Sequence, residues 1–226
     1  MANYNKGTET RDAILRSARE LFYGSGYLDT HNKDIAAHAG VNVGLIHYYY
    51  RTKGAMALEI YMDLLLTQLA LVREHFPEED LAVRNAIAIR FLWDMMQQDT
   101  ALLRFMHEIN AERIPLQMAD SSVGQHYIEG LNAGGGWLNE ERLQIICRCS
   151  IAAEMELIEH YASGSCAFSA EKLAELDERL TLQMVSVPER EILRVLQRSR
   201  ECAAPYCMEM YAPFAIRLRR REAGAE

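Results

Sequence analysis

Polar, aromatic and basic side chains gather between residues 42 and 53, around what reads as the start of a short helix. Asn42 can cap that helix, since its side-chain oxygen can accept an unpaired N–H of the first turn. The exposed start of such a helix can reach base edges in a major groove, and Val43 can meet a thymine methyl group. We expect these residues to contact DNA: Thr30, His31, Asn42, Val43, Gly44, His47, Tyr48, Tyr49 and Lys53. The alternative reading is a polar surface whose tyrosines cover a small core.

Residues 34–50 have the pattern of two short helices joined by a tight turn, which would position these side chains. Ile35, Ala36 and Ala39 recur at helical spacing and form one apolar face. Gly40 stands where a helix ends in a left-handed residue, a conformation that glycine adopts without a Cβ clash. Ile46 and Tyr50 are four residues apart and can pack back on the first helix. We expect Thr30 to cap the first of these helices and Thr52 to cap a later one that opens at Lys53.

This stretch and its flanks resemble the DNA-binding domain of the TetR family of transcriptional regulators. The residues that carry the resemblance are, in order, Arg11, Ile14, Leu15, Ala18, Leu21 and Phe22; Gly26, Tyr27 and Thr30; Asp34, Ile35 and Ala36; Ala39, Gly40 and Val41; Gly44, Ile46, Tyr49, Tyr50 and Lys53. They cover roughly the first quarter of the chain. The sequence departs from the family pattern at Asn32, at His47 and at the pair Tyr49–Tyr50. These departures affect the expected base preference and the local packing, but not the expectation that the domain is present.

The resemblance implies an all-α fold with a three-helix, helix-turn-helix domain at residues 1–53 and a larger helical domain at residues 54–226. The larger domain would hold an effector and dimerise. The implied function is that of a homodimeric repressor that a small apolar or aromatic ligand releases from a palindromic operator in double-stranded DNA. The alternative is a ligand-independent regulator or activator that acts through a protein partner. An enzyme that has acquired the domain is a distant third reading, and we expect no enzymatic activity.

Net charge agrees with this division. The formal charge is −8, which is unusual for a DNA-binding protein, but residues 1–53 hold seven basic and five acidic side chains. The remaining residues hold seventeen basic and twenty-seven acidic side chains. We expect the acidic part to stay away from the phosphates and DNA binding to weaken with salt.

Other residues whose side chains could act in catalysis or bind a metal form no convincing site. Gly134–Gly136 lacks the ending of a phosphate loop. The pairs His107–Glu108 and Glu154–Glu156 have no second ligand at metal spacing, so solvated faces or pocket polar groups are the better readings. An odd number of cysteines, Cys147, Cys149, Cys166, Cys202 and Cys207, argues against a disulfide framework and favours buried free thiols, with a redox sensor as the alternative. We expect no cofactor and no metal.

Beyond residue 53 the pattern is helical throughout, and we find no strand pattern. Helices are expected at about 10–24, 53–75, 81–98, 100–113, within 116–132, and at 139–163, 169–186, 188–201 and 204–220, with residues 1–9 loose and Pro213 kinking the last helix. No apolar run reaches the length of a membrane span and the N-terminus is no signal peptide, so we expect a cytoplasmic protein without a membrane partner.

The helix at 139–163 carries two stripes. One has small residues in the middle and suits close approach of a second helix; it predicts a dimer interface of Leu143, Ile146, Ser150, Ala153 and Leu157. Beside it lies a face that suits an apolar cavity, because methionines and aromatic residues gather on neighbouring helices. The predicted ligand-binding residues are Trp93, Met96, Phe105, Ile109, Met118, Tyr127, Cys147, Ile151 and Met155.

Overall fold

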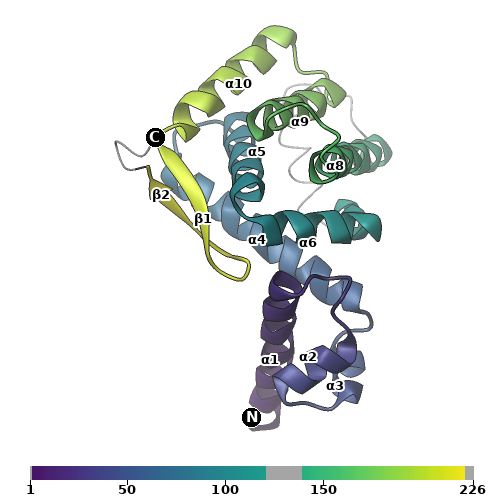
Figure 1. Cartoon of the computed structure of the whole chain (residues 1–226). Helices are drawn as coiled ribbons and strands as arrows, with labels where there is room; N and C mark the ends of the chain where they lie inside the picture. The colour runs from purple at the N-terminus through teal and green to yellow at the C-terminus, as the bar shows by residue number, and fades with distance from the viewer. Residues whose placement is uncertain (1, 121–138, 222–226) are drawn as a thin grey trace.

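A computed structural model describes residues 2–120 and 139–221 of the chain (Figure 1). Its elements are α1 (Ala2–Gly24), α2 (Asn32–Ala39), α3 (Val43–Tyr49), α4 (Lys53–His75), α5 (Leu81–Gln98), α6 (Thr100–Ala111), the 3-10 helix η1 (Ile114–Asp120), α8 (Glu140–Ala162), α9 (Ala170–Met184), α10 (Glu189–Ala203), β1 (Tyr206–Ala212) and β2 (Ala215–Arg220). The all-α fold class is confirmed, and most expected helices lie within two residues of their predicted bounds. The predicted helix within 116–132 and the triple glycine fall largely outside the described residues.

The small domain at the bottom of Figure 1 consists of α1, α2, α3 and the start of α4. Several predicted caps are confirmed: Gly40 ends α2 with a φ of 66°, the Asn42 side chain accepts a hydrogen bond from the Gly44 amide, and Thr52 accepts one from Ala55. Two expectations are wrong. The first helix begins at Ala2 rather than near Thr10, and α2 is capped by His31, so Thr30 is not the cap.

The larger domain is built around α5, which packs against α4, α6, α9, α10 and β1 (Figure 1). Most of α5 is buried, including Ile87, Phe91 and the fully buried Trp93. Helix α4 links the two domains, since it packs beside α1 and also on α5 and η1. The small domain therefore meets the core of the larger one through a continuous helix.

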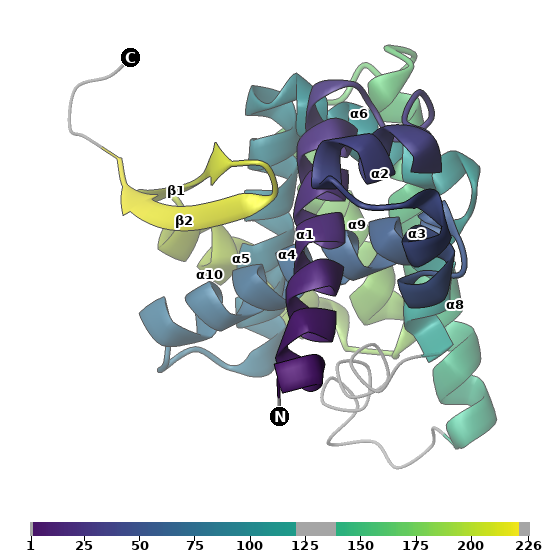
Figure 2. The same cartoon turned by 90° about the horizontal axis from the view of Figure 1, so that it is seen from below.

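The predicted helix over residues 204–220 is wrong, because this segment is an antiparallel hairpin (Figure 2). Met208 pairs with Leu218 and Met210 with Ile216, so their side chains share one face, which packs on α4 and α5. The charged residues between them point the other way, and Glu209 forms a 2.5 Å ion pair with Arg217 across the strands. Arg217 and Arg219 therefore lie on a strand, and Pro213 opens the turn of the hairpin.

Phe214 occupies the turn of the hairpin with a φ of 56° and only 4% of its surface exposed. Its ring centroid lies 4.5 Å from that of Phe105 in α6 and 5.7 Å from that of Tyr23 in α1. The tip of the hairpin thus packs where the two domains meet.

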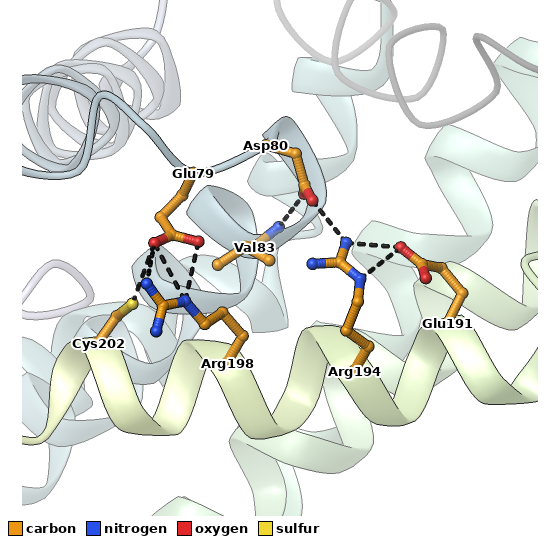
Figure 3. Close-up of polar contacts among 7 residues, drawn as sticks. All are labelled: Glu79, Asp80, Val83, Glu191, Arg194, Arg198 and Cys202. Carbon is orange, nitrogen blue, oxygen red and sulfur yellow. Dashed lines mark hydrogen bonds and ion pairs between the residues drawn. The ribbon is translucent and has the colours of Figure 1, made fainter.

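Ion pairs tie the turn before α5 to α10 (Figure 3). Arg198 binds Glu79 at 2.6 Å, and Arg194 binds Asp80 at 2.5 Å. Asp80 also caps α5 by accepting from the Val83 amide. Arg198 hydrogen bonding lowers the pKa of Glu79. Both pairs are partly exposed, so each contributes little stability alone, and their main effect is to fix where α10 lies.

Helix α4 is long and apolar enough to cross a membrane by length and composition, and 39% of its most apolar window is buried. In the described structure the apolar side chains of α4 pack in the core or line a cavity. Met56, Ile60, Leu64 and Val72 are buried in the core. Others line a cavity described below.

Replacing Phe214 with alanine should lower the free energy of unfolding by about 3–5 kcal/mol, because a buried aromatic ring is lost at the junction. Urea denaturation followed by circular dichroism measures this. The exposed Tyr211 of the same hairpin provides the control, since Tyr211→Ala should change stability by less than about 1 kcal/mol. Equal effects of the two changes would show that the hairpin tip does not stabilise the junction.

Candidate DNA-reading surface, domain junction and cavity

The outer face of α3 presents the side chains that the sequence predicted for DNA contact. Asn42, Val43, Gly44 and His47 are exposed, and Tyr48 is 79% exposed. Ile46 and Tyr50 are buried and hold α3 against the rest of the domain, as predicted. Tyr49 is partly buried, and its ring packs edge-on to that of Tyr48 at 5.0 Å. The first turn of α3 is therefore free to enter a groove.

Gly44 has open space where a side chain would stand. A Cβ added there would meet only the Asn42 side-chain oxygen, at 3.3 Å. Tight packing against α2 therefore does not explain this glycine. Close approach of a DNA backbone remains the prediction for it.

Two residues predicted to contact DNA form hydrogen bonds within their own domain. Thr30 is 2% exposed, and its hydroxyl donates to the Gly26 carbonyl at 2.6 Å. The Lys53 ammonium donates to the carbonyls of Tyr27 at 2.6 Å and Thr30 at 3.0 Å. Burial lowers the pKa of Lys53. Lys53 thus fastens the start of α4 to the loop between α1 and α2, and a phosphate contact would have to replace these bonds.

The junction between the domains depends on a buried carboxylate that the sequence did not single out for this role. Glu108 in α6 is 8% exposed and accepts hydrogen bonds from the backbone amides of Tyr27 and Leu28. Gly26 precedes them with a φ of 101°, and a Cβ there would stand 2.9 Å from a Glu108 oxygen. Glycine is needed at this position both for its backbone conformation and for the close approach of Glu108. The reading of Glu108 as a solvated residue is wrong.

Further contacts join the end of α1 to α6. Arg104 donates to the carbonyls of Tyr23 and Gly24, which satisfies acceptors left unpaired at a helix C-terminus. The Tyr27 hydroxyl donates to Glu112 at 2.5 Å. Phe22 stacks on Phe105 with centroids 6.3 Å apart. The orientation of α1 is therefore set by α6.

A cavity of about 130 Å³ lies in the larger domain between α4, α5, η1, α8 and α9. Its apolar lining residues are Met62, Leu65, Leu66, Leu69, Ala88, Ile89, Leu92, Met118, Cys147 and Ile151, and its polar ones are Tyr61, Gln68, Asn85, Ser150, Glu154, Asp177 and Thr181. The contribution of α4 was not predicted, because its apolar residues follow a simple core pattern.

Only some of the predicted pocket residues reach this cavity. Met118, Cys147 and Ile151 line it. Trp93 reaches it indirectly, since its indole N–H donates to Asp177 at 3.2 Å. Met96, Phe105 and Ile109 are buried in the main core, and Met155 packs beside the cavity without lining it. Tyr127 lies outside the described residues.

Carboxylates stand in this largely apolar setting. Burial raises the pKa of Glu154 to about 8 and that of Asp177 to about 7, and the Asp177 charge adds to the shift of Glu154. Burial also raises the pKa of the adjacent Glu178 to about 8. Glu154 and Asp177 influence each other, so they titrate as a pair.

The predicted dimer stripe on α8 faces the inside of its own subunit at two positions. Leu143 is buried beside Cys147, and the Ser150 hydroxyl hydrogen-bonds to Thr181 at 2.6 Å. Ile146, Ala153 and Leu157 are half-buried. The exposed stripe of this helix is instead Ile145, Cys149 and Ala152. Cys149 is thus a free, exposed thiol, whereas Cys147 is the one buried cysteine of the five.

A family model described as bacterial regulatory proteins, tetR family, matches residues 14–60, which span α1 after its first turns, α2, α3 and the start of α4. This part of the chain is therefore similar to TetR-family transcriptional regulators. It is 22% identical over 186 residues to an uncharacterised helix-turn-helix regulator, YdgC, of Bacillus subtilis, covering 80% of this chain and 95% of that one.

Solved structures share the fold of this chain along most of its length. The regulator RolR in complex with resorcinol superposes with a TM-score of 0.61 at 17% identity, covering 86% of this chain and 96% of RolR. FadR of Thermus thermophilus, a TetR-family repressor in complex with lauroyl-CoA, superposes with a TM-score of 0.60 at 22% identity, covering 79% and 96%.

Glu108→Gln should loosen the junction between the two domains. The neutral amide replaces a charged acceptor, and hydrogen bonds to charged groups contribute about 1.5–3 kcal/mol. We expect the amides of Tyr27 and Leu28 to exchange their hydrogens about 10–100 times faster. Glu112→Gln changes a carboxylate that accepts from the Tyr27 hydroxyl and from neither amide, so it should leave both amides protected. Unchanged exchange in Glu108→Gln would show that this carboxylate does not hold the junction.

The buried carboxylates should make stability depend on pH. Their folded pKa values, about 8 and about 7, lie above the values near 4 of unfolded chains. The folded state therefore keeps protons that the unfolded state releases, and stability falls as pH rises from about 4 towards 8, by up to ~1.4 kcal/mol per pH unit for each proton.

Chemical denaturation at pH 5, 6, 7 and 8 tests this. The double variant Glu154→Gln, Asp177→Asn should lose less stability than wild type over this range, whereas the exposed Glu156→Gln should follow wild type. A constant difference between the double variant and wild type at all four pH values would contradict the raised pKa values.

Proposed function

We propose that this regulator is a repressor that binds a palindromic operator as a homodimer and leaves it when a small molecule fills the cavity of the larger domain. The observation that carries the proposal is that α4 belongs to both sites. Its first residue, Lys53, is bonded to the DNA-reading domain, and its middle turns line the cavity. A ligand that displaces α4 would therefore also move α3.

A ligand releases DNA only if it binds the two orientations of the domain with different affinity. The junction offers a physical reason for such a difference. Helix α8 carries cavity residues and packs on α6, where Asn110 donates to the Met155 carbonyl and His107 lies 2.7 Å from Glu159. Helix α6 in turn holds the loop after α1 through Glu108. A change in the cavity would thus reach the DNA-reading domain along both α4 and α6.

Two structures that share this fold were solved with small molecules, which supports a ligand for a regulator of this fold. RolR was solved with resorcinol, and the Thermus thermophilus FadR with lauroyl-CoA. A cavity also favours a ligand-controlled regulator over one that acts only through a protein partner, which would need no internal space. The proposed site of action is the cytoplasm.

The homodimer is proposed on geometric grounds. A single small domain with one seven-residue reading helix makes too few contacts for tight specific binding, whereas two-fold symmetry doubles the interface with DNA. The exposed stripe of Ile145, Cys149 and Ala152 on α8 offers apolar and small side chains for close helix approach.

Binding-site selection from random duplexes tests the DNA-binding part of the proposal. Wild type should return one motif with two inverted half-sites, because a symmetric dimer reads the same bases twice. The double variant Val43→Lys, His47→Ala should return a different motif, since these exposed side chains lie where base edges are reached.

The control is Lys33→Ala, which removes an exposed charge of α2 and should weaken binding without changing the motif. A motif without inverted symmetry would overturn the dimer, and identical motifs for wild type and the α3 variant would overturn the reading role of α3.

A further inference from the structure

The cavity holds two acidic side chains from different helices, and neither has a basic partner among the residues that the structure describes. Glu154 comes from α8 and Asp177 from α9, and both line the cavity. Neither forms an ion pair with any lysine or arginine of the described residues. Residues 121–138 contain no lysine or arginine at all and one histidine, His126. Buried carboxylates in proteins are ordinarily paired with a cation, a metal or several hydrogen-bond donors.

The hydrogen-bond donors around this pair are neutral and few. Asp177 is 2% exposed and accepts from the Trp93 indole at 3.2 Å. Glu154 is partly exposed to the cavity, and the Tyr61 hydroxyl of α4 lies 3.5 Å from its oxygen, which is a long hydrogen bond. One further donor is directed at a neighbouring acid, since Asn85 donates to Glu178 at 2.8 Å. These donors compensate only part of the charge.

Arg90, an arginine of α5 whose charge acts on the neighbouring Glu178, forms its bonds elsewhere. Arg90 of α5 donates to the Ser199 hydroxyl at 2.8 Å and to the Leu196 carbonyl at 3.1 Å, both in α10. It also lies 3.6 Å from Glu175. It lines a different hollow, so its charge does not enter the cavity of Glu154 and Asp177.

The other wall of the cavity is apolar. Leu65, Leu66 and Leu69 of α4 line it, together with Ile89 of α5 and Ile151 of α8. A ligand that matches both walls has an apolar body and a positive end. The volume of about 130 Å³ sets its size, because engineered cavities of about 150 Å³ hold a benzene molecule.

We propose that the effector is a compact organic cation, an amine or quaternary ammonium with an apolar group of about one ring, whose charge lies between Glu154 and Asp177. This assignment rests on the proposed function and names the ligand class of the same site. It differs from the neutral apolar or aromatic ligand that the sequence indicated. A neutral ligand would leave the two acids, which repel each other when ionised, without a counter-charge.

Calorimetric titration of the intact protein with two probes of the same shape tests the charge directly. Phenyltrimethylammonium and tert-butylbenzene differ only in that a positive nitrogen replaces a carbon. We expect the cation to bind at least about tenfold more tightly to wild type at pH 8. The double variant Glu154→Gln, Asp177→Asn should lose this preference, and Glu156→Gln, an exposed acid on the same helix, should keep it.

Affinity for the cation should also rise from pH 6 to pH 8, because the cation favours the ionised carboxylates, whose pKa values lie at about 8 and about 7. The neutral probe should show no such rise. Circular dichroism melting of the variants verifies that each is folded before titration.

Equal binding of the two probes would overturn the cation and assign the cavity to a neutral ligand. Stronger binding of resorcinol than of the cation would assign it to a hydroxylated ring. Failure of both probes to bind would overturn the cavity as a site for ligands of this size. None of these results would affect the selected DNA motif, so the DNA-binding role is tested separately.

Discussion

The orientation of the DNA-reading domain depends on one buried carboxylate. Glu108 projects from α6 and accepts the backbone amides of Tyr27 and Leu28 in the loop that follows α1. Breaking these two hydrogen bonds would leave a buried carboxylate without partners, which would destabilise the fold strongly. The loop is therefore held firmly against α6. Gly26 makes the approach possible, since any side chain there would collide with the carboxylate. The rest of the junction is arranged around this contact.

Further contacts make the connection between the loop after α1 and helices α4 and α6 rigid; this connection is called the joint below. Lys53 binds the carbonyls of the same loop from α4, so the loop is held by α6 on one side and α4 on the other. The hairpin inserts Phe214 between Phe105 and Tyr23. Packed interfaces of this kind tend to switch between discrete arrangements instead of deforming smoothly. A ligand between α4 and α8 would therefore act on the same joint that fixes α3.

Local patterns in the sequence were sufficient for the helix-turn-helix and for most helix bounds. The αL residue Gly40 and the caps Asn42 and Thr52 depend only on near neighbours, and all three are confirmed. The hairpin is not predicted although Met208, Met210, Ile216 and Leu218 alternate with polar residues, because Pro213 is interpreted as a kink within one helix. Its alternation at period two was the signal that would have revealed it.

The sites that join distant segments could not be predicted in this way. Glu108 and the Tyr27 amide are 81 residues apart in sequence, and no local pattern indicates that they meet. The same holds for Asp177, which joins the cavity from a helix that showed no pocket pattern. Lys53 and Thr30 are predicted to contact DNA, while their polar atoms bind carbonyls of their own domain. Contacts between residues far apart in sequence therefore determine which polar side chains are already bonded within the fold and which can bind DNA or a ligand.

The central claim is that the cavity and the DNA-reading helix are coupled through this joint, and coupling between two binding sites is reciprocal. The most direct measurement is the affinity of phenyltrimethylammonium for the protein alone and for the protein bound to its selected duplex. The account predicts weaker binding of the probe to the DNA complex, by the same factor by which the probe weakens DNA binding, and a smaller factor in Glu108→Gln. Equal affinity of the probe for the free protein and for the DNA complex would contradict it.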